Sequence, residues 1–165
     1  MIIIRTPFRI TLGGGGTDLP SYYSMFGGFI FSFTLNKYMF INVNRPSVDK
    51  LIRLKYSESE TVENISDLKH DIARACLEKL GIERNIEITS MADLPAGSGL
   101  GSSSTYTVGL LNALHCLKRE HISLQELAEE ACDIEMNILS KPMGKQDQYL
   151  ATYGGFLVME IAREG

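Results

Sequence analysis

Apolar and polar residues alternate along several segments of the chain, a pattern of period two that predicts β-strands with their apolar face on a core. In the first segment Phe8 and Ile10 flank Arg9, so Arg9 is expected to project from the opposite face. The predicted strands are residues 2–12, 29–35, 39–43, 52–56, 86–89 and 156–161. We expect the early strands to be antiparallel and the last one to be buried.

Three further segments carry apolar residues every three or four positions, which is typical of amphipathic helices. These segments are residues 68–80, 100–117 and 124–139. Gly81 ends the first helix, and Ser123 with Glu126 three residues later forms a capping-box signature that opens the third. Strands followed by helices indicate an α+β fold, in which a mixed or antiparallel sheet carries helices packed on one side.

The composition is that of one ordinary globular domain, with 165 residues of which 44% are hydrophobic and 22% charged. The net charge of −4 lacks the basic excess of a nucleic-acid binder, and the three cysteines show no metal-ligand or disulfide spacing. The amino terminus lacks the pattern of a secretory signal, and no apolar run approaches the roughly 20 residues that span a bilayer. We therefore expect a cytoplasmic protein that binds neither nucleic acid nor membrane.

A glycine-rich turn runs directly into the second predicted helix, and this is the strongest chemical signal in the sequence. Glycines allow several backbone N–H groups to point at one anion, and a helix N-terminus adds roughly half a positive charge. Serine hydroxyls in the first helical turn can bond phosphate oxygens or reach a metal. The residues of this candidate phosphate-binding loop are Pro95, Ala96, Gly97, Ser98, Gly99, Leu100, Gly101, Ser102, Ser103 and Ser104. The simpler alternative is a serine-capped helix start after a flexible turn.

Two acidic residues stand out farther along the chain. At about 100° per residue, Glu135 falls inside the apolar stripe of the third predicted helix, where a carboxylate needs a counter-ion, a metal or hydrogen-bond partners. Asp147 lies in a predicted loop and could act as a general base, with Arg9 or a nearby lysine holding it ionised. The alternatives are a Glu135 that reaches water at the edge of the stripe and an Asp147 on an ordinary surface loop.

A short polar segment near the amino terminus follows four consecutive glycines and precedes two tyrosines. Carboxylates can bridge paired sugar hydroxyls, and aromatic rings can cover the C–H face of a sugar, so this segment indicates a sugar pocket. Its candidate residues are Gly15, Gly16, Thr17, Asp18 and Tyr22. A plain glycine-rich hairpin is the alternative.

Four of these segments together resemble the galactokinase, homoserine kinase, mevalonate kinase and phosphomevalonate kinase superfamily, the GHMP kinases. Residues 6–18 are similar to its first motif, and residues 95–104 are similar to its phosphate-binding loop. Glu135 stands where the family keeps a magnesium-ligating glutamate, and residues 144–148 resemble its catalytic-aspartate segment. The resemblance is specific because all four matches occur in the order that the family shows.

This resemblance implies a fold like the second domain of ribosomal protein S5 and transfer of the γ-phosphoryl group of ATP with Mg²⁺. It implies that the loop cradles the triphosphate and that Ser103 and Glu135 hold the Mg²⁺. It also implies that Asp147 takes the proton of the acceptor hydroxyl, with Arg9 beside it as the second catalytic residue.

The first motif also indicates which sugar accepts the phosphoryl group. The resemblance implies that Asp18 binds sugar hydroxyls, but Gly15 and Gly16 stand where galactokinases carry Glu-His, so galactose is disfavoured. The run Gly-Gly-Gly-Thr-Asp-x-Pro-x-Tyr instead resembles the D-glycero-D-manno-heptose 7-phosphate kinases, with the fucokinase-like kinases close behind. We therefore expect ATP-dependent phosphorylation of the anomeric hydroxyl of this heptose 7-phosphate, which gives the 1,7-bisphosphate.

Two alternatives to this function stay open. One is a fucokinase-like or other sugar kinase, and the other is a non-catalytic relative that senses a sugar or a nucleotide. The acidic charge balance disfavours an RNA-binding module. No residue is clearly dedicated to a 7-phosphate, although Arg5, Lys141 and Lys145 are candidates. A homodimer is also left open.

The superfamily's third glycine-rich motif, which belongs to a carboxy-terminal domain, does not occur in these 165 residues. The resemblance implies that residues 1–165 form the amino-terminal, ATP-binding domain and that the carboxy-terminal domain is absent from this chain. Because that second domain closes one wall of the active-site cleft, we expect this portion alone to be inactive.

Overall fold

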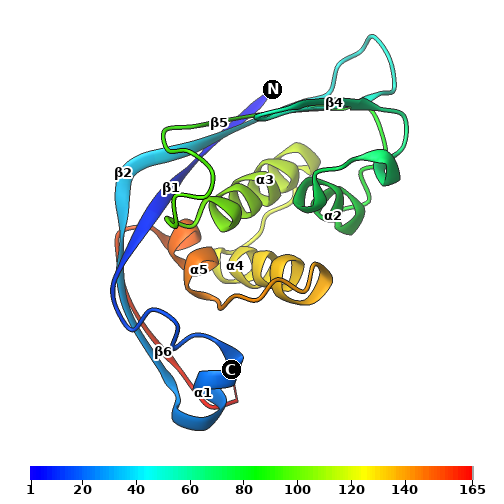
Figure 1. Cartoon of the computed structure of the whole chain (residues 1–165). Coiled ribbons are helices and arrows are strands. Elements are labelled where there is room, and N and C mark those ends of the chain that lie inside the picture. The colour runs from blue at the N-terminus through cyan, green and yellow to red at the C-terminus, as the bar shows by residue number, and fades with distance from the viewer. Residues whose placement is uncertain (165) are drawn as a thin grey trace.

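A curved sheet of six strands forms one layer of the molecule, and helices α2 to α5 lie on its inner side, where α4 packs on α3 and α5 rather than on the strands (Figure 1). The computed structural model describes residues 1–164. The strands are β1 (Ile2–Gly13), β2 (Gly28–Asn44), β3 (Ile52–Lys55), β4 (Ser59–Val62), β5 (Ile86–Ala92) and β6 (Phe156–Ile161). Their order is β1-β2-β5-β3-β4, with β6 paired to β2, and β3 runs parallel to β5. This confirms the predicted α+β class, with a mixed sheet and helices on one side.

The α-helices are α1 (Pro20–Phe26), α2 (Asp71–Lys79), α3 (Ser102–Lys118), α4 (Leu124–Cys132) and α5 (Gln146–Tyr153). The capping box of Ser123 and Glu126 forms at the start of α4, which continues into a π-helical turn, η2 (Asp133–Ile138). A 3₁₀ turn, η1 (Ile65–Asp67), precedes α2. The sequence patterns missed α1, β4 and α5, so Asp147 lies in the first turn of a helix rather than in a loop. No helix within residues 1–164 combines the length and apolar character needed to cross a bilayer.

β2 is one continuous strand of 17 residues, where two shorter strands were predicted. It pairs with β1 on one side along its length, and on the other side with β6 through its first half and β5 through its second half. The pairing with β1 shifts between Pro7 and Arg9, opposite residues 34–38 of β2. We call the part of β1 and β2 beyond this bulge, together with β6, the arm. The rest of β1 and β2 with β3, β4 and β5 is the upper half of the sheet, and the arm extends away from it toward α1 (Figure 1).

The bulge reverses which face of the strands is buried, because an irregularity in register turns later side chains to the other side of a sheet. In the second half of β2 the odd-numbered Ile41 is fully buried, whereas in the arm the even-numbered Ile30 and Ser32 are. β1 changes in the same way, since Phe8 is fully buried and the adjacent Arg9 also faces the helices. The inner face of the arm is therefore partly polar.

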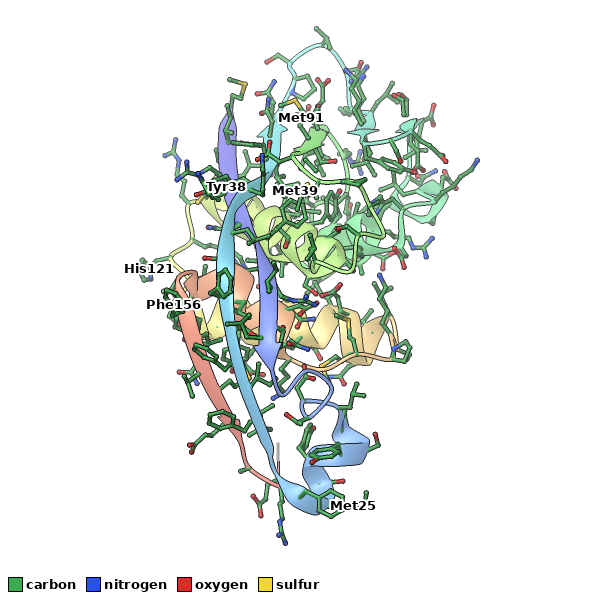
Figure 2. All side chains as sticks on the ribbon, turned by 60° about the vertical axis from the view of Figure 1, so that its left-hand side comes forward. Met25, Tyr38, Met39, Met91, His121 and Phe156 are labelled. Atoms are coloured by element: carbon green, nitrogen blue, oxygen red, sulfur yellow. The ribbon has the colours of Figure 1, made fainter. Side chains whose placement is uncertain are left out.

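The prediction that Phe29 and Phe31 face the core is wrong, because they are 53% and 37% exposed on the outer face of the arm. Phe156, which was expected to be buried, is 77% exposed on the same face. Its ring centroid lies 5.6 Å from that of Phe33 and 6.4 Å from that of Phe31. Figure 2, in which the outer side of the sheet is turned forward, labels Phe156 at the start of β6.

The main core lies between the upper half of the sheet and helices α2 and α3. α3 approaches the sheet closely at Gly109, where a Cβ atom would lie 2.7 Å from Thr6 Oγ1 and 3.1 Å from Ile41 Cγ1. The absence of a side chain at this position thus sets the separation between α3 and the strands. That separation in turn places the first turn of α3 relative to β1.

Gly109→Ala is expected to destabilise the protein, although alanine favours a helix over glycine by about 1 kcal/mol. The added methyl group would push α3 away from β1 and β2, and overpacking of this kind costs about 1–3 kcal/mol. Thermal unfolding checks this, with Cys116→Ala at an exposed position of α3 as the control. A Gly109→Ala variant as stable as the wild type would show that α3 can shift without cost.

Candidate active site

The glycine-rich loop connects β5 to α3 and is exposed at residues 95–99. Gly97, Gly99 and Gly101 have positive φ angles of 76°, 74° and 81°, a conformation that favours glycine. At the start of α3 the hydroxyl of Ser102 is buried and has no partner among the described residues. A buried polar group without a partner costs about 1–3 kcal/mol, so an oxygen-rich anion at this helix N-terminus would satisfy it.

Arg9 of β1 and Asp147 of α5 meet although 138 positions separate them in the sequence. Arg9 Nε donates to Asp147 Oδ1 at 2.6 Å, and Nη2 donates to Oδ2 at 2.7 Å. Both side chains are largely buried. A bidentate pair of this kind fixes the plane of the carboxylate as well as its position.

Arg9 also ties this pair to the glycine-rich loop. Its Nη1 donates to the carbonyl oxygen of Gly99 at 3.0 Å, and its backbone N–H donates to that of Leu100 at 3.4 Å. The loop lies so close that a Cβ atom on Gly101 would be 3.3 Å from Asp147 Oδ2. One arginine therefore joins β1, the loop and α5 at a single point.

Glu135 is fully buried in η2, and the structure brings it into contact with the start of α3. One of its carboxylate oxygens accepts a hydrogen bond from Ser103 Oγ, and the other accepts one from Gln148 Nε2 at 2.7 Å. Within residues 1–164, His, Cys, Asp and Glu side chains form no metal-binding group of three or more. One carboxylate with one hydroxyl nevertheless fits Mg²⁺, which keeps several waters and takes its remaining ligands from substrate phosphates.

A pocket of about 150 Å³ opens beside Asp147 and is bordered by Gly16 and Asp18. Asp18 is only 2% exposed, and its carboxylate accepts hydrogen bonds from the backbone N–H of Gln146 at 3.1 Å and from Gln146 Nε2 at 3.4 Å. Gly144 leaves room for this carboxylate, since a Cβ atom there would lie 2.1 Å from Asp18 Oδ2. The sequence patterns did not single out Gln146, whose role depends on a contact across 128 positions.

The structure does not bring the other predicted sugar residues to this pocket. The Thr17 hydroxyl is bonded to the backbone of Phe29, and Tyr22 borders a separate hollow between α1 and β6. Gly15 lies against the side chain of Thr11. Of the five candidates, Gly16 and Asp18 therefore have the clearest geometric link to Asp147.

The three basic candidates for a sugar phosphate also lie apart from this pocket. The guanidinium of Arg5 lies 4.3 Å from the centroid of the Tyr38 ring. Lys145 Nζ lies 3.5 Å from a carboxylate oxygen of Glu129, whereas Lys141 borders a different hollow near the loop. Arg9 is thus the cation that the structure places against Asp147.

That different hollow has a volume of about 510 Å³ and lies between β5, the start of α2 and the start of α3. Figure 2 labels two of its wall residues, Met39 of β2 and Met91 of β5. Ser102 and Ser103 border it as well, so it is continuous with the candidate anion site. No motif in the sequence pointed to this hollow, because its wall residues come from separate elements.

Comparison with known proteins assigns this chain to a family. The family model described as the GHMP kinases N terminal domain matches residues 53–155. The chain belongs to the GHMP kinase family. The predicted resemblance is thereby confirmed for the family, and the loop, Glu135 and Asp147 all fall within the matched range.

Two curated relatives show how much of a GHMP kinase is present. The D-glycero-alpha-D-manno-heptose 7-phosphate kinase of Campylobacter jejuni is 32% identical over 168 residues, covering 95% of this chain and 50% of that protein. The galactokinase of Chloroflexus aggregans is 26% identical over 166 residues, covering 92% of this chain and 40% of that protein. The chain therefore spans about half the length of the curated relatives it matches.

A solved structure shows the same arrangement of elements. The crystal structure of a D-glycero-D-manno-heptose 1-phosphate kinase from Bacteroides thetaiotaomicron matches with a TM-score of 0.90 at 29% identity. The match covers 99% of this chain and 57% of that chain. The fold of this GHMP kinase chain is thus that of part of a longer kinase.

The stability of this GHMP kinase chain is expected to fall as the pH drops below about 6.5, the pKa of an unperturbed histidine. His70 is the N-cap residue of α2 and lines the 510 Å³ hollow. Burial lowers the pKa of His70 below its ordinary value, Asp71 and Glu60 oppose the shift, and Lys141 adds to it. An unfolded chain therefore binds this proton at a higher pH than the folded one, so acid favours unfolding. Thermal unfolding across this range checks the expectation: His70→Asn should flatten the decline, whereas His121→Asn should not. An unchanged decline in His70→Asn would contradict it.

Proposed function

We propose that the protein containing this chain transfers the γ-phosphoryl group of ATP to the anomeric hydroxyl of D-glycero-D-manno-heptose 7-phosphate, which forms the 1,7-bisphosphate. The observation that carries this proposal is the Arg9–Asp147 pair, which lies between the glycine-rich loop and the pocket beside Asp18. Phosphoryl transfer to a hydroxyl depends mainly on positioning and charge neutralisation. A carboxylate held between an anion site and a small polar pocket supports that chemistry.

The nucleotide would occupy the loop and the adjoining hollow of about 510 Å³. Its triphosphate would bind the exposed loop backbone, the N-terminus of α3 and the hydroxyl of Ser102. Its base would enter the hollow, where Tyr56 and Tyr106 contribute aromatic surface. Lys141, which also lines the hollow, would add positive charge near the phosphates.

Ser103 and Glu135 would hold a Mg²⁺ ion against the phosphates of ATP. Bound there, the ion would neutralise negative charge on the phosphoryl oxygens. Gln148 fixes the carboxylate of Glu135 from the other side, and such a second partner keeps a metal ligand in one orientation.

Asp147 would accept the proton of the acceptor hydroxyl as the general base. Arg9 occupies both carboxylate oxygens and also contacts the carbonyl of Gly99, so it fixes the base relative to the loop. Asp18 accepts two hydrogen bonds from Gln146, and a carboxylate offers about four lone-pair sites. It therefore keeps the capacity to accept hydrogen bonds from sugar hydroxyls.

The choice of a heptose 7-phosphate as acceptor is supported by the first motif and by the relatives. Gly15 and Gly16 bring no side chain to the region where galactokinases carry Glu-His. The relative with 32% identity is a heptose 7-phosphate kinase by name. The solved structure with 29% identity is named as a heptose 1-phosphate kinase, so its name supports the heptose but not the position of the phosphate. A galactokinase also matches, but at 26% identity.

We propose that residues 1–165 are the nucleotide-binding half of this cytoplasmic enzyme and that a carboxy-terminal domain completes the cleft. Arg5 stacks on Tyr38 and Lys145 pairs with Glu129, so each of these basic side chains already has a partner within this chain. We propose that the contact with the 7-phosphate comes from the second domain. This portion alone would bind nucleotide weakly and show little turnover.

The function is tested by assaying the full-length protein with ATP and Mg²⁺ on the heptose 7-phosphate, free galactose and free fucose. The expected result is the highest kcat/KM for the heptose 7-phosphate, with a 1,7-bisphosphate identified by mass spectrometry. A higher kcat/KM for fucose would favour a fucokinase-like enzyme. Nucleotide binding without any sugar phosphorylation would favour a sensor.

Asp147→Asn should lower kcat by about 10²–10⁴ while ATP affinity is retained, because the variant loses the base and not the loop.

Glu135→Gln is expected to weaken metal binding while preserving the shape of the side chain. The neutral amide removes the charge that attracts the cation, so the affinity for Mn²⁺, a paramagnetic substitute for Mg²⁺, should fall when a non-hydrolysable ATP analogue is present. Electron paramagnetic resonance measures this directly. Asp133→Asn is the matched control, because it removes a carboxylate from the same turn that pairs outward with Lys79. Equal Mn²⁺ affinity in wild type and Glu135→Gln would exclude Glu135 from the metal site.

A further inference from the structure

His70 is held in one orientation on the wall of the 510 Å³ hollow, at the N-cap of α2. Its Nδ1 accepts a hydrogen bond from the backbone N–H of Ala73 at 3.2 Å. The ring meets Tyr56 edge-on, with centroids 4.8 Å apart and planes at 88°, and lies 4.7 Å from the centroid of Tyr106. The imidazole cannot turn out of its plane without breaking both aromatic contacts, and a half-turn that exchanges its two nitrogens would break the helix cap.

A buried carboxylate fixes the backbone that carries this ring. Glu60 accepts hydrogen bonds from the backbone N–H groups of Lys69 at 2.6 Å and His70 at 3.2 Å, and from the Tyr56 hydroxyl at 3.0 Å. Burial opposes ionisation of Glu60, but these hydrogen bonds together lower its pKa. Burial, with Glu60 beside it, raises the pKa of Tyr56 to about 12, so Tyr56 stays a neutral donor. The position of His70 is thus set before any ligand arrives.

The hydrogen bond at Nδ1 also determines where the ring carries its proton. Because Nδ1 accepts from Ala73, the neutral imidazole must hold its hydrogen on Nε2. Burial lowers the pKa of His70, which favours this neutral form near neutral pH. Within residues 1–164 no hydrogen bond engages Nε2, so one N–H donor on a rigid ring is left for a ligand in the hollow.

We infer that His70 is a specificity-determining residue whose Nε2–H donates a hydrogen bond to a ring nitrogen of the adenine of ATP. The inference rests on the proposed function, which places the nucleotide base in this hollow. Adenine presents acceptors at its ring nitrogens and a donor at its amino group, and only an acceptor can pair with Nε2–H. A fixed donor rejects a base without the matching acceptor, because a protein N–H that was bonded to water would lose its partner. A bond to N1 would reject guanine, which carries a hydrogen there, whereas a bond to N3 or N7 would select purines over pyrimidines.

Two substitutions separate the two nitrogens of His70. His70→Asn places an amide oxygen near the position of Nδ1, so it should keep the cap of α2 but lose the donor to the base. His70→Gln places an amide N–H near the position of Nε2, so it should keep the donor but lose the cap. Both variants lose the ring contacts with Tyr56 and Tyr106, and only His70→Gln also loses the cap, so the unfolding temperature is expected to be lower for His70→Gln than for His70→Asn.

The test is the affinity of the full-length protein and both variants for ATP and for its 1-deaza, 3-deaza and 7-deaza analogues, measured by calorimetry with Mg²⁺. One analogue should bind wild type about 3- to 10-fold more weakly than ATP, the range expected for one lost hydrogen bond. His70→Asn should abolish this difference, and His70→Gln should retain it. Wild-type affinities equal for all three analogues, or a difference that survives in His70→Asn, would overturn the inference.

Tripolyphosphate serves as the probe that lacks a base. It should bind wild type and His70→Asn equally, because it has no base to accept the hydrogen bond from His70. If His70→Asn lowered the affinity for tripolyphosphate as much as the affinity for ATP, the substitution would have a general structural effect, and the inference would be overturned. If wild type bound neither ATP nor tripolyphosphate, the proposed function itself would be wrong, and the assignment of His70 would fall with it.

Discussion

The bulge between Pro7 and Arg9 determines which side chains face the helices in the arm, and the candidate active site depends on it. Above the bulge the inner face is apolar and forms the main core. Beyond it Phe29 and Phe31 face outward, and polar side chains of β1 and β2 join Ile30 on the inner face. Thr11, for example, receives a hydrogen bond from Ser32 and donates one to Gln146 of α5. The same two strands thus build a core at one end and a polar site at the other.

Arg9 is one of the side chains that face the helices beyond the bulge, and it connects the strands to the candidate active site. Its guanidinium reaches α5 and the glycine-rich loop together, so three segments distant in sequence are fixed relative to one another. Reactions that depend on positioning lose rate when reacting groups shift by about 1 Å. The Asp147 carboxylate is held by two short charge-assisted hydrogen bonds from an arginine that also holds the loop, so its position is fixed before substrates bind.

Local patterns in the sequence were sufficient for helices α2, α3 and α4, the capping box, the loop and the inward position of Glu135. They failed where the answer depended on long-range pairing. The alternation from Phe29 to Leu35 showed that one face of this strand is more apolar than the other. It could not show which face the helices cover, because that depends on the bulge. His70 and Gln146 were not found because single residues carry no periodic signal, and their contacts exist only after α2 meets α3 and α5 meets the amino-terminal segment.

The close approach of Gly144 to Asp18 has a consequence for how such sequences can change over evolution. Any side chain at position 144 would displace the carboxylate of Asp18, since its first carbon would overlap an oxygen atom. The same Cβ atom would lie 2.5 Å from the backbone oxygen of Asp18, so a smaller side chain at position 18 would not remove this restriction. Position 144 should therefore stay glycine across homologues whether or not residue 18 is an aspartate, although 126 positions separate the two in the chain and neither is the proposed base.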